Sequence, residues 1–136
     1  MTTAQAGRVI LDSGGVTALA EGDPRARAVL VRARREGRLV VIPAPVLTEV
    51  YTERHDHARI DRVINAVDMQ IDTTAERAKH AGVLRARSGV LSVVDAIVVA
   101  EAVAALPAVI VTSDPDDIRA LADAAQAADR VAIVAV

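Results

Sequence analysis

Short apolar runs alternate along the chain with longer segments whose apolar residues recur at helical spacing. The runs are rich in Val, Ile and Leu, and they predict buried strands at 8–12, 39–42, 69–71, 108–112 and 131–134. The segments between them predict helices over 16–20, 24–36, 46–51, 58–67, 73–87, 93–105 and 114–127. Strands that alternate with helices are typical of crossover connections. We therefore expect an α/β fold with a mainly parallel sheet of about five strands, covered on both faces.

Three of the predicted helices begin at recognisable capping residues. Asp23 is followed by Pro24, which suits the first position of a helix. Ser92 precedes a long apolar segment and is expected to cap it. Thr73 and Glu76 have the spacing of a capping box, which predicts that a helix begins at Thr73.

Composition limits the kind of protein that the chain can form. A length of 136 residues with 52% hydrophobic residues predicts a single domain, 1–136, and the one aromatic residue, Tyr51, leaves the core to aliphatic side chains. The absence of cysteine excludes disulfides, thiol nucleophiles and cysteine-ligated zinc. There is no signal-peptide pattern at the N-terminus and no apolar run long enough to span a membrane, so we expect a cytoplasmic protein.

Four acidic residues lie beside or inside apolar segments. Asp12 ends the first predicted strand, Asp114 follows the fourth by two residues, and Glu49 and Asp95 lie in the opening turns of helices. In open α/β sheets, ligands bind outside the carboxyl ends of the strands, and all four residues can reach that edge. Placing acids in apolar surroundings costs free energy unless a hydrogen bond or a cation offsets it. We therefore expect the four carboxylates to share one cation-binding site.

Each acid also has a simpler structural interpretation. Asp12 and Asp114 could each cap the helix that follows, and Asp95 could complete a capping box with Ser92. Glu49 could be favoured near a helix N-terminus by the helix dipole alone. These interpretations account for each acid singly, but they do not explain why Glu49 and Asp95 share their turns with so many apolar residues.

An all-oxygen site of this kind suits Mg²⁺ or Mn²⁺ rather than zinc or copper. Such an ion lowers the pKa of a bound water, which can then attack phosphorus, and it neutralises charge on the phosphoryl group. The chemistry predicted for the shared site is therefore metal-dependent hydrolysis of a phosphodiester, with one or two ions.

Four segments carry a family resemblance: VILDSGGVTALA, IPAPVLTEVY, SVVDAIVVAEA and VTSDPDDIRAL. In this order they resemble the PIN-domain ribonucleases, specifically the toxin component of VapBC-type toxin–antitoxin pairs, and the resemblance covers essentially the whole chain. It implies a PIN-like three-layer α/β/α sandwich. The metal-binding and catalytic residues that it implies are Asp12, Glu49, Asp95 and Asp114.

The resemblance also assigns supporting residues around the four acids. Asp116 is implied as an auxiliary metal ligand, with Asp117 as a competing choice. Ser13, Thr112 and Ser113 are implied as residues that support the site. The Gly14–Gly15 pair departs from the family pattern, and we expect it to loosen the first turn that holds Asp12.

The function implied by the resemblance is that of a Mg²⁺- or Mn²⁺-dependent endoribonuclease that cleaves structured RNA, such as tRNA or rRNA. A cognate antitoxin protein would block the acidic site, and a homodimer is expected. Against RNA binding stand the formal net charge of -2 and the near absence of aromatic residues that could stack on bases. Arginines could hold phosphates instead, and the candidates are Arg25, Arg32, Arg35, Arg85 and Arg87, with Arg54 as a further one.

Other classes of function stay open at this point. The Arg-rich segment could be only a solvated helix face. A receiver-like phospho-acceptor would need a lysine late in the chain, but the one lysine is Lys79. A non-catalytic interaction module could keep the fold, and a structure-specific DNA nuclease could use the same acids.

Overall fold

The computed structural model describes residues 7–52 and 57–136, so Arg54 lies outside the described residues. Five strands form one sheet in the order β3-β2-β1-β4-β5, and all four pairings are parallel. The strands are β1 (Arg8–Leu11), β2 (Val40–Pro43), β3 (Met69–Ile71), β4 (Ala108–Thr112) and β5 (Val131–Ala135). The prediction of a parallel five-stranded sheet is confirmed.

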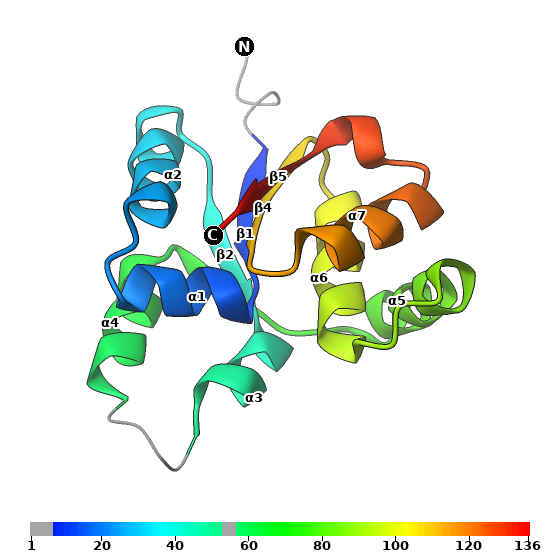
Figure 1. Cartoon of the computed structure of the whole chain (residues 1–136), viewed down its shortest axis with the longest axis horizontal. Helices are drawn as coiled ribbons and strands as arrows, with labels where there is room; N and C mark the ends of the chain where they lie inside the picture. Colours follow the sequence, from blue (N-terminus) through cyan, green and yellow to red (C-terminus); the bar gives the residue numbers. More distant parts are fainter. Residues whose placement is uncertain (1–6, 53–56) are drawn as a thin grey trace.

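Helices cover both faces of this sheet, as predicted. One layer contains α1 (Ser13–Ala20), α2 (Pro24–Arg35) and α4 (Ala58–Ala66), and the other contains α5 (Ala75–Ser88), α6 (Val93–Val103) and α7 (Pro115–Ala124) (Figure 1). The helix predicted over 46–51 is shorter than expected. It consists of a 3-10 turn, η2 (Ala44–Val46), and one helical turn, α3 (Leu47–Val50). A second 3-10 turn, η3 (Ala128–Arg130), leads into β5.

The core is aliphatic and centres on β1, β4 and α6. Ile10 and Ile110, which pair across the two strands, are both 0% exposed. Helix α6 is buried from Asp95 to Ala102, which agrees with its apolar composition. Within the described ranges, no helix is long and apolar enough to cross a membrane.

The helix starts test the predicted capping residues. Asp23 and Ser92 cap α2 and α6 through side-chain oxygens, as predicted. The predicted start at Thr73 is wrong, because Thr74 caps α5 and accepts a hydrogen bond from the Arg77 N–H at 3.1 Å. Adjacent threonines offer the same hydroxyl one residue apart, and the sequence pattern does not distinguish them.

Strand register brings several segments to one edge of the sheet. Leu11 pairs with Val111 in the neighbouring strand, so Asp12 leaves β1 beside the residues that follow β4. The turns η2 and α3 leave β2 at the same carboxyl edge, on the other side of β1. Figure 1 shows the N-terminal end of α6 close to this edge. The fold therefore gathers four distant parts of the sequence around one location.

Candidate metal centre at the carboxyl ends of the strands

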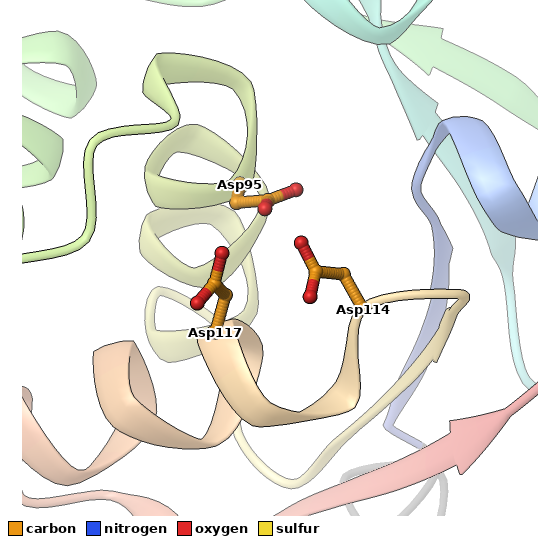
Figure 2. Close-up of side chains that lie close together, drawn as sticks. All are labelled: Asp95, Asp114 and Asp117. Atoms are coloured by element: carbon orange, nitrogen blue, oxygen red, sulfur yellow. The ribbon is translucent and has the colours of Figure 1, made fainter.

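Three aspartates from two helix starts form the centre of the acidic cluster. One carboxylate oxygen each from Asp95, Asp114 and Asp117 lies within 4.8 Å of the other two. Figure 2 shows the carboxylates turned toward one another, with Asp95 on α6 facing the other two at the start of α7. The structure thus brings two of the four predicted acids together and adds Asp117.

Asp12 is the most deeply buried acid of the site, with 2% of its surface exposed. It caps α1, and its Oδ1 accepts a hydrogen bond from the Gly15 N–H at 2.8 Å. Burial raises the pKa of its carboxyl, and the nearby charge of Glu49 adds to the rise, while hydrogen bonds from Thr112 and from backbone N–H groups oppose it. The capping interpretation of Asp12 is correct, and the charge of Asp12 also contributes to the raised pKa of Asp95.

Thr112 connects the first and the last of the predicted acids. Its Oγ1 accepts a hydrogen bond from the Asp114 N–H at 2.8 Å, and its hydroxyl is near enough to Asp12 to lower the pKa of that carboxyl. The residue is 0% exposed at the end of β4. One buried hydroxyl can therefore donate to Asp12 while it fixes the backbone that carries Asp114.

The glycine pair allows close packing at the same point. A Cβ on Gly14 would lie 2.1 Å from the Ser113 Oγ, and a Cβ on Gly15 would lie 2.6 Å from the Val111 carbonyl oxygen. Both glycines are in the first turn of α1, which begins directly after Asp12. The expectation that the pair loosens this turn stays a prediction. The pair lets α1 approach the loop between β4 and α7.

Asp95 lies in the first turn of α6 and is 7% exposed. Burial raises its pKa to about 7, and the charges of Asp12, Asp114 and Glu49 contribute to the rise. These charge effects link Asp95 to the other three predicted acids. The capping residue of this helix is Ser92, whose Oγ accepts a hydrogen bond from the Asp95 N–H at 3.1 Å. The cap holds the backbone of Asp95, and its carboxylate faces the cluster.

Asp114 does not act as a capping side chain, although it occupies the N-cap position of α7. Loss of hydration raises its pKa, and the charge of Asp117 raises it further. Asp116 points away from the cluster, because its side chain is 96% exposed and lies 3.4 Å from the Arg119 guanidinium. Between the two auxiliary acids, geometry favours Asp117. Residues three apart share one face of a helix start, a signal that the sequence also contains.

Glu49 lies at the side of the cluster rather than in its centre. It is exposed on α3 and lines a hollow of about 530 Å³ together with Ser13, Gly14 and Ser113. Its charge contributes to the raised pKa of both Asp12 and Asp95. Glu49 therefore acts on the cluster through its charge, and it is not among the three residues whose oxygens lie within 4.8 Å of one another.

The residues present fit a small divalent cation. All donors are oxygens, which is the preference of Mg²⁺ and Mn²⁺. Two oxygens bound to one Mg²⁺ lie at most about 4 Å apart, given bonds of about 2.1 Å. The 4.8 Å limit on the three aspartates is close to this value, so small side-chain rotations would suffice. No lysine or arginine is within ion-pair distance of these three carboxylates in the described residues.

The arginines predicted to contact RNA fall into two groups. Arg32 forms an ion pair with Glu36 at 3.1 Å, and Arg85 donates two hydrogen bonds to the Leu91 carbonyl oxygen, at 2.8 and 3.2 Å. These two guanidinium groups are therefore already occupied. The side chains of the other three are exposed and have no ion pair among the described residues: Arg25, Arg35 and Arg87.

The parallel sheet, its order and its two helical layers define a PIN-like α/β/α fold, as the resemblance implied. No protein-family model and no curated protein sequence matches the chain. Its fold is similar to that of a chain in the crystal structure of VapBC2 from Rickettsia felis bound to a DNA fragment from their promoter. The TM-score is 0.66 at 14% sequence identity, and the match covers 92% of this chain and 96% of that chain. At this identity the match shows a shared fold.

Proposed function

We propose that this chain is a Mg²⁺- or Mn²⁺-dependent endoribonuclease and the toxin of a type II toxin–antitoxin pair. The observation that carries the proposal is the cluster of Asp95, Asp114 and Asp117, with Asp12 and Glu49 near enough to raise the pKa of Asp95 and with no lysine or arginine of the described residues paired to the three aspartates. Carboxylates gathered without a cation repel one another, and a bound dication relieves that repulsion. We take residues 1–136 as one nuclease domain that acts in the cytoplasm.

Asp95, Asp114 and Asp117 are the residues that would hold a first ion, with Asp12 and Glu49 completing the site or holding a second. The ion, when bound, supplies charge neutralisation for the phosphoryl group and a water of lowered pKa. Asp12 would form the buried floor of the site, because its carboxylate is 2% exposed and accepts a hydrogen bond from a backbone N–H of α1. Glu49 lies on the open side, where it can orient the attacking water toward a phosphodiester.

The raised pKa values of the cluster agree with this use. A carboxyl such as Asp95, with a pKa of about 7, is partly protonated in the metal-free protein near neutral pH. Binding of a dication would displace that proton, so metal affinity should rise with pH. The fold similarity to VapBC2 supports the toxin part of the proposal, because that protein is a toxin–antitoxin complex by its name. We extend this to a cognate antitoxin and a homodimer for the present chain.

The decisive test is to sequence RNA ends after brief expression of the protein. Wild type should generate new ends at a small number of positions in structured RNA, and Asp95→Asn should generate none. Asp116→Asn is the matched control, because it removes the same charge at an exposed position outside the cluster, and it should cleave like wild type. New ends that persist with Asp95→Asn would refute the catalytic assignment, and cleavage of DNA alone by the purified protein would favour a DNA nuclease.

A further inference from the structure

Three neighbouring hollows lie along α1 and α4, and the first of them is beside the acidic cluster. The first hollow, of about 530 Å³, is lined by Thr17 and Glu49 and by Ser113, the residue before Asp114. A second one of about 270 Å³ shares Thr17 and Glu49 and extends to Arg59. A third hollow of about 440 Å³ shares Arg59 and Glu21 with the second. The three hollows therefore lie next to one another, with the second between the first and the third.

The third hollow, which is the farthest from the cluster, is rich in guanidinium groups. Arg27 from α2 and two residues of α4, Arg59 and Arg62, line the third hollow, together with aliphatic side chains such as Leu30 and Val63. All three arginines are exposed. None forms an ion pair with a carboxylate among the described residues, including Glu21 in the same hollow. We name the row of hollows that begins at Glu49 and ends at these three arginines the arginine groove.

These arginines differ from most others in the chain because they are available. Arg32, Arg38, Arg77 and Arg119 are in ion pairs. Arg8, Arg34 and Arg85 donate to backbone carbonyl oxygens. Guanidinium groups without an internal partner, gathered at one hollow, have the charge to bind an anionic polymer.

We propose that the arginine groove holds the RNA backbone on one side of the phosphodiester that is cut. The inference rests on the proposed function and adds the path of the substrate to it. A polyanion is repelled by an acidic cluster, so its binding energy must come from cations at a distance from the cut. The groove begins at Glu49 and ends at three arginines, which gives the polymer that arrangement. With almost no aromatic residue available, guanidinium planes and the aliphatic floor would contact the bases.

The experiment measures RNA binding in the Asp95→Asn background, where no cleavage interferes. The probe is a fluorescein-labelled hairpin RNA with a single-stranded extension, and anisotropy gives the dissociation constant across a range of salt concentrations. Arg59→Gln with Arg62→Gln should weaken binding by about tenfold or more. The slope of the logarithm of the binding constant against the logarithm of the salt concentration should fall in magnitude by about two, one for each arginine removed. The matched control is Arg119→Gln with Arg130→Gln, which removes the same charge from exposed sites outside the groove and should weaken binding by less than about threefold.

A third variant tests the sign of the effect. Glu21 lies in the groove near the proposed path, so Glu21→Gln should strengthen RNA binding by about two- to fivefold. Equal binding by the Arg59/Arg62 variant and its control would overturn the inference. Because binding is measured without cleavage, this outcome is separate from failure of the proposed function, which would appear as absence of RNA cleavage by wild type.

Discussion

Helix α6 carries two buried acids whose carboxylates have opposite surroundings. Glu101, with 2% of its surface exposed, forms an ion pair with Arg77 at 3.1 Å, and the Arg8 guanidinium lies against the carbonyl oxygen of the same residue. Asp95, six residues earlier on the same helix, is 7% exposed and is surrounded by other acids. Glu101 is neutralised by the protein itself. No cation of the described residues pairs with Asp95, and the proposed function assigns that role to a dication from solution.

The comparison first predicts opposite stability changes for two charge-neutralising substitutions. Glu101→Gln should lower the free energy of unfolding by about 2–4 kcal/mol, because it leaves the half-buried Arg77 without its partner. Asp95→Asn should raise the free energy of unfolding in EDTA, because repulsion within the cluster is relieved. Urea denaturation of both variants and wild type measures the two changes. A loss of stability in Asp95→Asn as large as that in Glu101→Gln would contradict the comparison.

Stabilisation of the folded protein by Mg²⁺ should depend on Asp95 and not on Glu101. Addition of Mg²⁺ at about 100 times its dissociation constant should stabilise wild type by about 2.7 kcal/mol, because the ion binds the folded state alone. The increase should disappear in Asp95→Asn and persist in Asp116→Asn and Glu101→Gln. Thermal unfolding with and without Mg²⁺ provides the measurement. Equal stabilisation of Asp95→Asn and wild type would mean that the ion binds elsewhere.

The metal-free protein should become less stable as pH rises toward neutrality. The Asp95 carboxyl has an ordinary pKa of 3.8 when unfolded and about 7 when folded. Between these two values the folded state holds a proton that the unfolded state has lost, so stability falls as pH rises through this window. Burial also raises the pKa of Asp12 and of Asp114, in the same direction. Denaturation in EDTA at pH 5 and pH 7.5 should show the decline, with a smaller slope for Asp95→Asn.

The smallest predicted effect concerns the loop that leads into α6. Arg85 donates two hydrogen bonds to the Leu91 carbonyl oxygen, and the next residue, Ser92, caps the turn that carries Asp95. Arg85→Lys keeps the charge but cannot reproduce the forked contact, so hydrogen exchange at the Asp95 amide should accelerate by about three- to tenfold. Arg87→Lys is the control and should not change the exchange rate. Equal rates in both variants would mean that Arg85 does not support this turn.

The sequence predicted the sheet well because its signals are local. Apolar runs such as 108–112 and capping residues such as Ser92 determine strands and helix starts without reference to distant residues. The carboxyl edge that gathers the acids followed from strand alternation alone. The error at Thr73 arose where two adjacent residues offer the same hydrogen bond.

The candidate site was less accessible to sequence analysis because it depends on side-chain orientation. The choice of Asp117 over Asp116 depends on which carboxylate faces α6, and that is set by how α7 packs. The same limit applied to the arginines. No sequence pattern indicates that Arg85 is bound to a backbone carbonyl, or that α2 and α4 bring Arg27 and Arg59 to one hollow.

The close contact between Gly14 and Ser113 allows the packing of the site to be changed without changing its charge. A methyl group at position 14 would collide with the segment that carries Asp114, and it would change no ionisable group. Gly14→Ala is therefore expected to displace Asp114 relative to Asp95 while the number of carboxylates stays the same. Loss of Mg²⁺ stabilisation in this variant would show that the spacing of the acids matters in addition to their charge.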